Sequence, residues 1–114
     1  MQIVNEKISI PELKAMSKKM FGELVKAVVD VEKEIMIVDS SMHADAESFL
    51  LENKSLQQNL WGINLYPDQF PNDDWIEFDS MINIRPTDGN RSRGVDNPQI
   101  QEKIKKIVIK LVTK

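Results

Sequence analysis

The first apolar residues of the chain recur every three or four positions, as they do on one face of an α-helix. These residues are Ile10, Leu13, Met16 and Met20. Ser9 and Glu12 form the sequence signature of a capping box at the start of this stripe, and Gly22 fits a left-handed position at its end. The pattern therefore predicts a helix over residues 10–21.

Residues 24–39 fit both a helical stripe and the alternation of a strand. Their many β-branched side chains favour strands. Three consecutive charged residues at 32–34 interrupt the apolar pattern. We therefore expect two antiparallel strands, over residues 24–31 and 35–39, joined by a short turn.

A short helix is predicted within residues 43–52, where three consecutive apolar residues follow a segment rich in Ala and acidic residues. Asp45 is the candidate N-cap, and the helix is expected to end near Asn53. The final helix is predicted to open at Asp96-Asn97-Pro98, because Asp or Asn caps a helix and Pro suits its first turn. Its buried stripe is Ile100, Ile104, Ile107, Val108 and Leu111.

Residues 60–85 contain two runs of alternating apolar and polar side chains, separated by a segment rich in Pro, Asp and Asn. This pattern predicts a β-hairpin. A register with Tyr66 opposite Trp75 brings the two alternations into phase, and the second strand is predicted to continue to Arg85 with Asn83 on its polar face. The register pairs Leu65–Ile76, Ile63–Phe78 and Trp61–Ser80 on the apolar face, and Asn64–Glu77 and Gly62–Asp79 on the polar face.

Strands with one apolar face and amphipathic helices bury their apolar surfaces against one another. The elements above therefore predict an α+β fold, a two-layer sandwich with a mainly antiparallel sheet and helices packed on one face. The chain has 114 residues and no internal repeat or Gly/Ser-rich linker, so we expect one domain over residues 1–114.

The composition excludes several classes of protein. The chain has no cysteine, which rules out disulfides, thiolate metal sites and thiol nucleophiles and fits a cytosolic protein. Hydrophobic residues make up 41% and charged residues 29%, so disorder is excluded as the main state. No signal-peptide core opens the chain and no run of 18 apolar residues occurs, so neither export by that route nor a membrane span is expected.

The charges are divided unevenly along the chain. Residues 39–84 hold nine acidic side chains and one lysine, whereas residues 85–114 hold eight basic side chains and three acidic ones, including every arginine of the chain. The loop 85–94 therefore gathers guanidinium groups that bind phosphate or carboxylate in a bidentate manner, together with polar donors. The candidate anion-binding residues are Arg85, Asn90, Arg91, Ser92 and Arg93. The alternative is that these arginines pair with the acidic middle segment and only order the loop.

Two carboxylates and the only histidine form a second candidate site. Glu77 and Asp79 are predicted to project from the same strand face, and His43 shares a helix face with Glu47. Together, His43, Glu77 and Asp79 are the candidate ligands for Mg²⁺ or Mn²⁺, or the candidate acid and base groups. The alternatives are an ordinary solvated sheet face and a helix start enriched in acids. No Walker motif or other cofactor motif is present.

Several stretches resemble a small prokaryotic family of uncharacterised proteins, a domain of unknown function. The stretches are LWGINLYP at 60–67, IEFDSMINIRP at 76–86 and GNRSRG at 89–94, with HADAE at 43–47. The similarity covers nearly the whole chain. It implies a stand-alone prokaryotic protein and carries no reaction, cofactor or catalytic residue.

Three functional hypotheses follow. The first is a binding or interaction module whose arginine loop engages a small anionic ligand or an acidic protein surface. The second is a small metal-assisted hydrolase that uses Glu77 and Asp79 with His43. The third is a homo-oligomer, such as a homodimer, whose sheet faces pack through Tyr66 and Trp75. Nucleic acid is a less favoured partner because the sequence pI is about 5.2.

Overall fold

A five-stranded sheet forms the centre of the computed structural model, which describes residues 1–114. Its strands run in the order β1-β4-β3-β5-β6, and every neighbouring pair is antiparallel. The strands are β1 (Gln2–Val4), β3 (Val25–Asp30), β4 (Ile35–Val38), β5 (Leu60–Leu65) and β6 (Ile76–Glu77). The two strands predicted within residues 24–39 are confirmed as β3 and β4.

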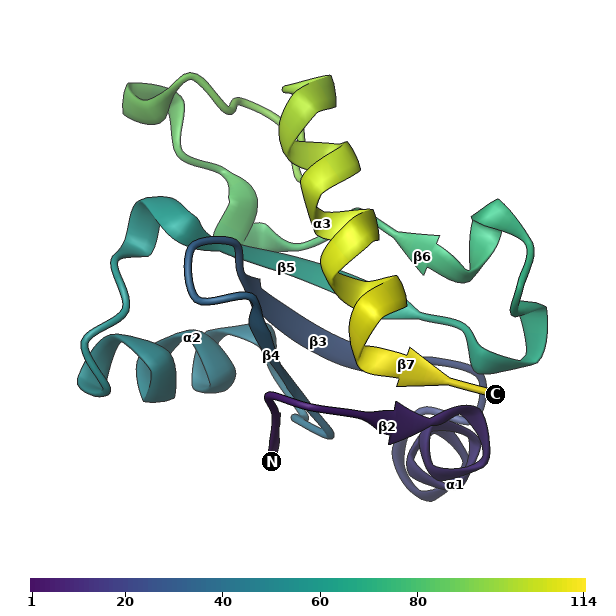
Figure 1. Cartoon of the computed structure of the whole chain (residues 1–114). Helices are drawn as coiled ribbons and strands as arrows, with labels where there is room; N and C mark the ends of the chain where they lie inside the picture. The colour runs from purple at the N-terminus through teal and green to yellow at the C-terminus, as the bar shows by residue number, and fades with distance from the viewer.

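Three α-helices pack around this sheet (Figure 1). They are α1 (Ile10–Met20), α2 (His43–Glu52) and α3 (Pro98–Leu111). Two short strands, β2 (Ile8–Ser9) and β7 (Val112–Thr113), pair in parallel and join the start of α1 to the end of α3. The predicted α+β class with a mainly antiparallel sheet is therefore confirmed. None of the helices is long and apolar enough to cross a membrane.

The main core lies between the sheet and helices α1 and α3. Alternate residues of β3, such as Val25 and Val29, point into it together with Trp61 and Ile63 of β5. The predicted stripe of α3 is confirmed, since Ile104, Ile107, Val108 and Leu111 are buried there and Ile100 packs at the margin. This arrangement removes most of the α3 stripe from water, together with Ile10 and Leu13 of the α1 stripe, and burial of apolar surface is the main force that holds the layers together. Met20 at the end of α1 stays exposed.

Helix α2 packs against the other face of the sheet, which differs from the prediction that the helices lie on one face. Val28, Ile37 and Leu60 point away from the main core, and Ala46 and Leu50 of α2 cover them. The reason is that these strands carry apolar residues on both faces, so each face needs a cover. Helix α2 covers only part of this face, and Lys26 and Asn64 on the rest of it line a cavity.

The helix ends follow local sequence in two cases and differ in the third. Ser9 accepts a hydrogen bond from Glu12 N–H, and the Glu12 carboxylate accepts one from Ser9 N–H, so the capping box is confirmed. Of the two candidate caps of α3, Asp96 and Asn97, it is Asn97 that caps the helix. The prediction that Asp45 caps α2 is wrong, because the helix already begins at His43 and Asp45 lies in its first turn.

Asp30 organises the turn between β3 and β4. Its side chain is buried, and Oδ1 accepts hydrogen bonds from the N–H groups of Glu32 and Lys33 at 2.9 and 3.0 Å. Oδ2 accepts a hydrogen bond from Ser55 Oγ at 2.7 Å. A buried carboxylate thus replaces the usual Asn-Gly turn chemistry, which the sequence lacks here.

The predicted hairpin register is confirmed where the strands pair. Asn64 lies opposite Glu77, Leu65 lies opposite Ile76, and Tyr66 N–H donates to Trp75 O at 2.7 Å. The second strand ends at Glu77, however, and does not continue to Arg85. The chain instead forms a 3₁₀ turn, η4. The 3₁₀ turns are η1 (Gln57–Asn59), η2 (Pro67–Gln69), η3 (Asp73–Trp75), η4 (Met81–Asn83) and η5 (Pro86–Asp88).

Asn83 takes the place of the missing strand. Its side-chain amide accepts from Gly62 N–H at 2.8 Å and donates to Gly62 O at 3.0 Å, as a paired strand residue would. Asn83 is therefore fully buried and not on a polar strand face. Ser80 lies over Gly62, where an added Cβ would meet Ser80 Cβ at 2.5 Å, so the expected Trp61–Ser80 pair does not form.

Candidate functional site

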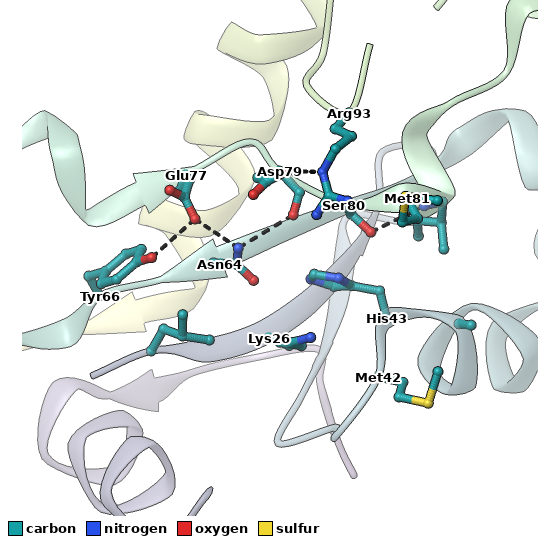
Figure 2. A pocket seen from close by; sticks show the side chains of 13 residues that line it. Lys26, Met42, His43, Asn64, Tyr66, Glu77, Asp79, Ser80, Met81 and Arg93 are labelled. Carbon is teal, nitrogen blue, oxygen red and sulfur yellow. Dashed lines mark hydrogen bonds and ion pairs between the residues drawn. The ribbon is translucent and has the colours of Figure 1, made fainter. Parts of the chain in front are cut away.

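The sheet face against which α2 packs borders a cavity of about 450 Å³, in the part that α2 does not cover. It lies between the start of α2, strands β3 and β5, and the segment that follows β6 (Figure 2). Its polar lining includes His43, Asn64, Glu77, Asp79 and Arg93. Its apolar lining includes Leu24, Met42, Met81 and Ile82. We call this cavity the α2 pocket.

Glu77 and Asp79 both line the α2 pocket, but they do not share a strand face as predicted, because β6 ends at Glu77 and Asp79 lies beyond it. Glu77 Oε1 accepts hydrogen bonds from Asn64 Nδ2 at 2.8 Å and from Tyr66 Oη at 3.1 Å. Burial and the contact with Glu77 raise the pKa of Tyr66, so its phenol remains a donor at neutral pH. Asp79 Oδ1 accepts from Arg93 Nε at 2.5 Å. One oxygen of each carboxylate is thus occupied, and the other has no protein partner.

Asn64, which lines the α2 pocket, has a buried oxygen without a hydrogen-bond partner. The atom that contacts Glu77 must be the NH₂ group, because a carboxylate only accepts, and this fixes the orientation of the amide. Oδ1 is then buried without a hydrogen-bond partner, on a side chain that is only 7% exposed. In Figure 2 this oxygen points away from Glu77, toward the side where His43 and Lys26 lie. Buried acceptors of this kind are rare in folded proteins.

His43 is a neutral group in the α2 pocket. Its Nε2 lies 2.8 Å from Ile63 O, and because a carbonyl only accepts, Nε2 carries the proton. Burial lowers the pKa of His43, so the ring is uncharged at neutral pH. Nδ1 is then an acceptor with no protein partner. The ring extends from the start of α2 toward Asn64 (Figure 2).

The N-terminus of α2 also borders the α2 pocket. Met42, His43 and Ala44 line it, and no side chain accepts a hydrogen bond from the first turn of the helix. Free N–H groups and the helix dipole create positive potential at such an end. Lys26 of β3 adds a further positive charge to the lining.

The five candidate residues of the arginine loop do not face one site. Arg93 reaches the α2 pocket, whereas Arg85 and Asn90 line a separate cavity. Asn90 Nδ2 donates to three backbone carbonyls, and its Oδ1 accepts from Asp96 N–H. Ser92 Oγ donates to Asp96 Oδ1 at 2.5 Å. Asn90 and Ser92 therefore hold the loop in shape.

Arg85 and Arg91 have different surroundings. Arg85 is only 7% exposed, and its Nη1 donates to Leu60 O at 2.9 Å and to Ile82 O at 3.1 Å. It is therefore not on a polar strand face, because the carbonyls of Leu60, at the start of β5, and of Ile82, in η4, hold it. Arg91 is exposed, and only its backbone N–H is bound, by Asp96.

The proposed metal ligands share the α2 pocket but do not form a ligand cluster. His43, Glu77 and Asp79 all line it. The chain has no group of three or more His, Asp or Glu side chains that could hold a metal ion. Asp79 is instead paired with Arg93.

The aromatic pair assigned to an oligomer interface is divided by the structure. Trp75 is 3% exposed and packs in the main core, with its ring edge-on to Phe70 at 5.1 Å between centroids. Tyr66 lines the α2 pocket. The expectation that both present one exposed face is wrong, because Trp75 lies in the 3₁₀ turn η3 and not in a strand.

A protein-family model described as "Protein of unknown function (DUF5674)" matches residues 2–111. The chain belongs to this family. No curated protein and no solved structure matches it.

The sequence analysis of this DUF5674 chain did not assign Lys26 to a site, and it placed Asn64 beside Glu77 without giving it a role, although both line the α2 pocket. Asn64 is the only polar side chain of β5, and Lys26 and Asp30 are the only polar side chains of β3, and that was the available signal. A polar side chain within a buried strand needs a partner or a site. The pattern alone does not show that Lys26 and Asn64 face the same cavity as His43.

Proposed function

We propose that the protein is a binding module whose α2 pocket holds a small polar ligand. The proposal rests on the observation that residues far apart in the sequence line the same cavity. His43, Glu77 and Arg93 come from three separate parts of the chain, and all line one cavity with the unpartnered Asn64 oxygen. A cavity of about 450 Å³ lies within the usual range for small-molecule sites.

The ligand that fits best carries N–H donors. The free acceptors of the α2 pocket are Asn64 Oδ1, His43 Nδ1 and the second oxygens of Glu77 and Asp79. An amino or ammonium group would satisfy the Asn64 oxygen and offset the acidic side of the pocket.

The same ligand carries an anionic group. Lys26, the half-exposed Arg93 and the uncapped start of α2 supply the positive potential for it. Of the predicted anion-binding residues in the loop 85–94, Arg93 is the one that would contact this anionic group. The proposed ligand class is therefore a small anion that also carries an amino group, such as an amino acid or a nucleotide of adenine, cytosine or guanine.

A binding role accounts for the geometry better than metal-assisted hydrolysis does. Asp79 is paired with Arg93 and Glu77 Oε1 already accepts two hydrogen bonds, so each carboxylate offers only one oxygen to a metal, and no cluster of three acidic or His side chains is present to complete a site. The hydrolase alternative predicts that Mn²⁺ stabilises the protein and that Asp79→Asn abolishes this effect.

Thermal melting with a panel of amino acids and nucleoside monophosphates tests the proposal. Propionate is the matched control for alanine, and ribose 5-phosphate is the matched control for the nucleotides, because both lack the amino group. A bound ligand at about 100 times its Kd stabilises by roughly 2.7 kcal/mol, or about 10 °C for a chain of this size. We expect at least one amino-bearing anion to reach a shift of several degrees that its control does not produce.

Two substitutions test whether the ligand binds in the α2 pocket. Lys26→Met and Arg93→Gln should reduce the melting shift by at least half, because each removes a positive charge from the α2 pocket. Lys106→Met is the matched control, since Lys106 is exposed on α3 and outside the pocket. A shift that is equal in all three variants, or equal for a ligand and its control, would contradict the proposal.

A further inference from the structure

Arg85 presents an unused pair of donors. Its Nη1 is bound to two backbone carbonyls, but Nε and Nη2 are buried and have no hydrogen-bond partner. Nε and Nη2 lie on one edge of the guanidinium group, and their parallel N–H bonds match the two oxygens of a carboxylate. Buried donors without partners are costly, so this edge calls for an acceptor.

A third unpartnered donor lies beside the same group. The Arg85 guanidinium carbon is 4.3 Å from the centre of the Trp61 ring, and Trp61 Nε1 is also buried without a partner. Both side chains line a cavity of about 450 Å³ whose other lining residues include Gln58, Asn90 and Asn97. This cavity shares no lining residue with the α2 pocket.

We infer that this second cavity is a carboxylate-binding site in which the Nε–Nη2 edge of Arg85 holds the two oxygens and Trp61 Nε1–H is a neighbouring donor. Stacking on Trp61 and the two carbonyl contacts fix the guanidinium plane, so the donor edge is held in place before a ligand arrives. The site is independent of the ligand proposed for the α2 pocket.

Asp88 competes for this edge. Its Oδ2 lies 3.5 Å from Arg85 Nε, in an ion pair that includes no hydrogen bond, and half of its side chain is exposed. Glu47 is the other carboxylate whose charge acts on Arg85, and it forms no hydrogen bond with it. A ligand carboxylate must therefore displace Asp88, and removal of the Asp88 charge should strengthen binding.

Nuclear magnetic resonance of the two indole groups tests the site. Acetate is the probe, acetamide is its neutral control of similar shape, and ionic strength is kept constant with sodium chloride. We expect acetate to shift the Trp61 indole signal in a saturable way, while the signal of Trp75, which lies in the main core, stays in place. Acetamide should move neither signal.

The Asp88→Asn variant makes the test specific to the Arg85 edge. It should lower the dissociation constant for acetate by roughly twofold to fivefold, the range that exposed ion pairs contribute. Arg85→Lys keeps the charge but not the paired donors, so it should abolish the shift if the variant folds. The proposal is overturned if acetate leaves the Trp61 signal unchanged, if acetamide moves it equally, or if Asp88→Asn leaves the dissociation constant unchanged.

Discussion

Asn83 is the residue on which the outer edge of the sheet depends. It supplies with one side chain the two hydrogen bonds that a strand would give to Gly62, and it also donates to Arg93 O at 2.8 Å. Through these contacts it holds the segment after β6 and the arginine loop against β5. The position of Asp79 and Arg93 in the α2 pocket therefore rests on a buried amide outside it.

Replacement of Asn83 by Ala should destabilise the protein by about 2–4 kcal/mol, because it leaves both backbone groups of Gly62 without these partners. The measurement is urea unfolding followed by circular dichroism. Asn72→Ala is the matched control, since the Asn72 side chain is exposed and forms no hydrogen bond, and it should change stability by less than about 0.5 kcal/mol. Equal effects of the two substitutions would show that Asn83 does not replace a strand.

His43 should make stability depend on pH. Burial lowers the pKa of His43 in the folded state, so the unfolded chain takes up the proton more readily. The contribution of His43 to the free energy of unfolding is therefore constant above the ordinary His pKa of about 6.5, and it falls as the pH drops below that value. The stability difference between the wild type and His43→Gln, measured by urea unfolding, should narrow between pH 7.5 and pH 5. A difference that widens over this interval would contradict the buried, neutral state of His43.

The hairpin of β3 and β4 illustrates an element that tertiary contacts define. The sequence predicts both strands but offers no favoured turn residues between them. Asp30 replaces these with hydrogen bonds to two backbone N–H groups of the turn and to Ser55, which follows α2. One carboxylate thus shapes the turn and ties it to the α2 layer.

Asp30→Ala should cost about 2–3 kcal/mol of unfolding free energy, because hydrogen bonds to a charged acceptor contribute more than neutral ones. Asp30→Asn keeps an oxygen for the turn N–H groups and should cost less than half as much. Asp74→Ala, an exposed acid without side-chain hydrogen bonds, is the control for loss of charge. If Asp30→Ala matches Asp74→Ala in chemical denaturation, the turn does not depend on this side chain.

Elements with local signals could be predicted from the sequence. The capping box of α1, the Asn97 cap and stripe of α3, and the register of Asn64 with Glu77 all follow from residue spacing. The segment 78–85 could not, because its alternation satisfies a strand equally well. What decides its structure is the contact of Asn83 and Ser80 with Gly62, about twenty residues away.

The whole molecule shows why the site was predicted only in parts. The sequence singled out His43, the Glu77–Asp79 pair and the arginine loop separately. The fold brings the first two together with Arg93, and it places Arg85 at a different cavity. The distribution of these residues over two cavities depends on which sheet face α2 covers and on where β6 ends. The spacing of residues in the sequence predicts neither. The two cavities give the chain two candidate sites of different chemistry.

The most direct test of the α2 pocket as a ligand site is a titration followed by nuclear magnetic resonance of side-chain groups. The probes are L-alanine and adenosine 5′-monophosphate, with propionate and ribose 5-phosphate as their controls. We expect at least one probe to produce saturable shifts of the Asn64 amide, the His43 ring and Arg93 Nε–H, larger than those from its control, while the Trp75 indole is unchanged. Signals that stay in place with both probes, or that move elsewhere on the surface, would contradict it.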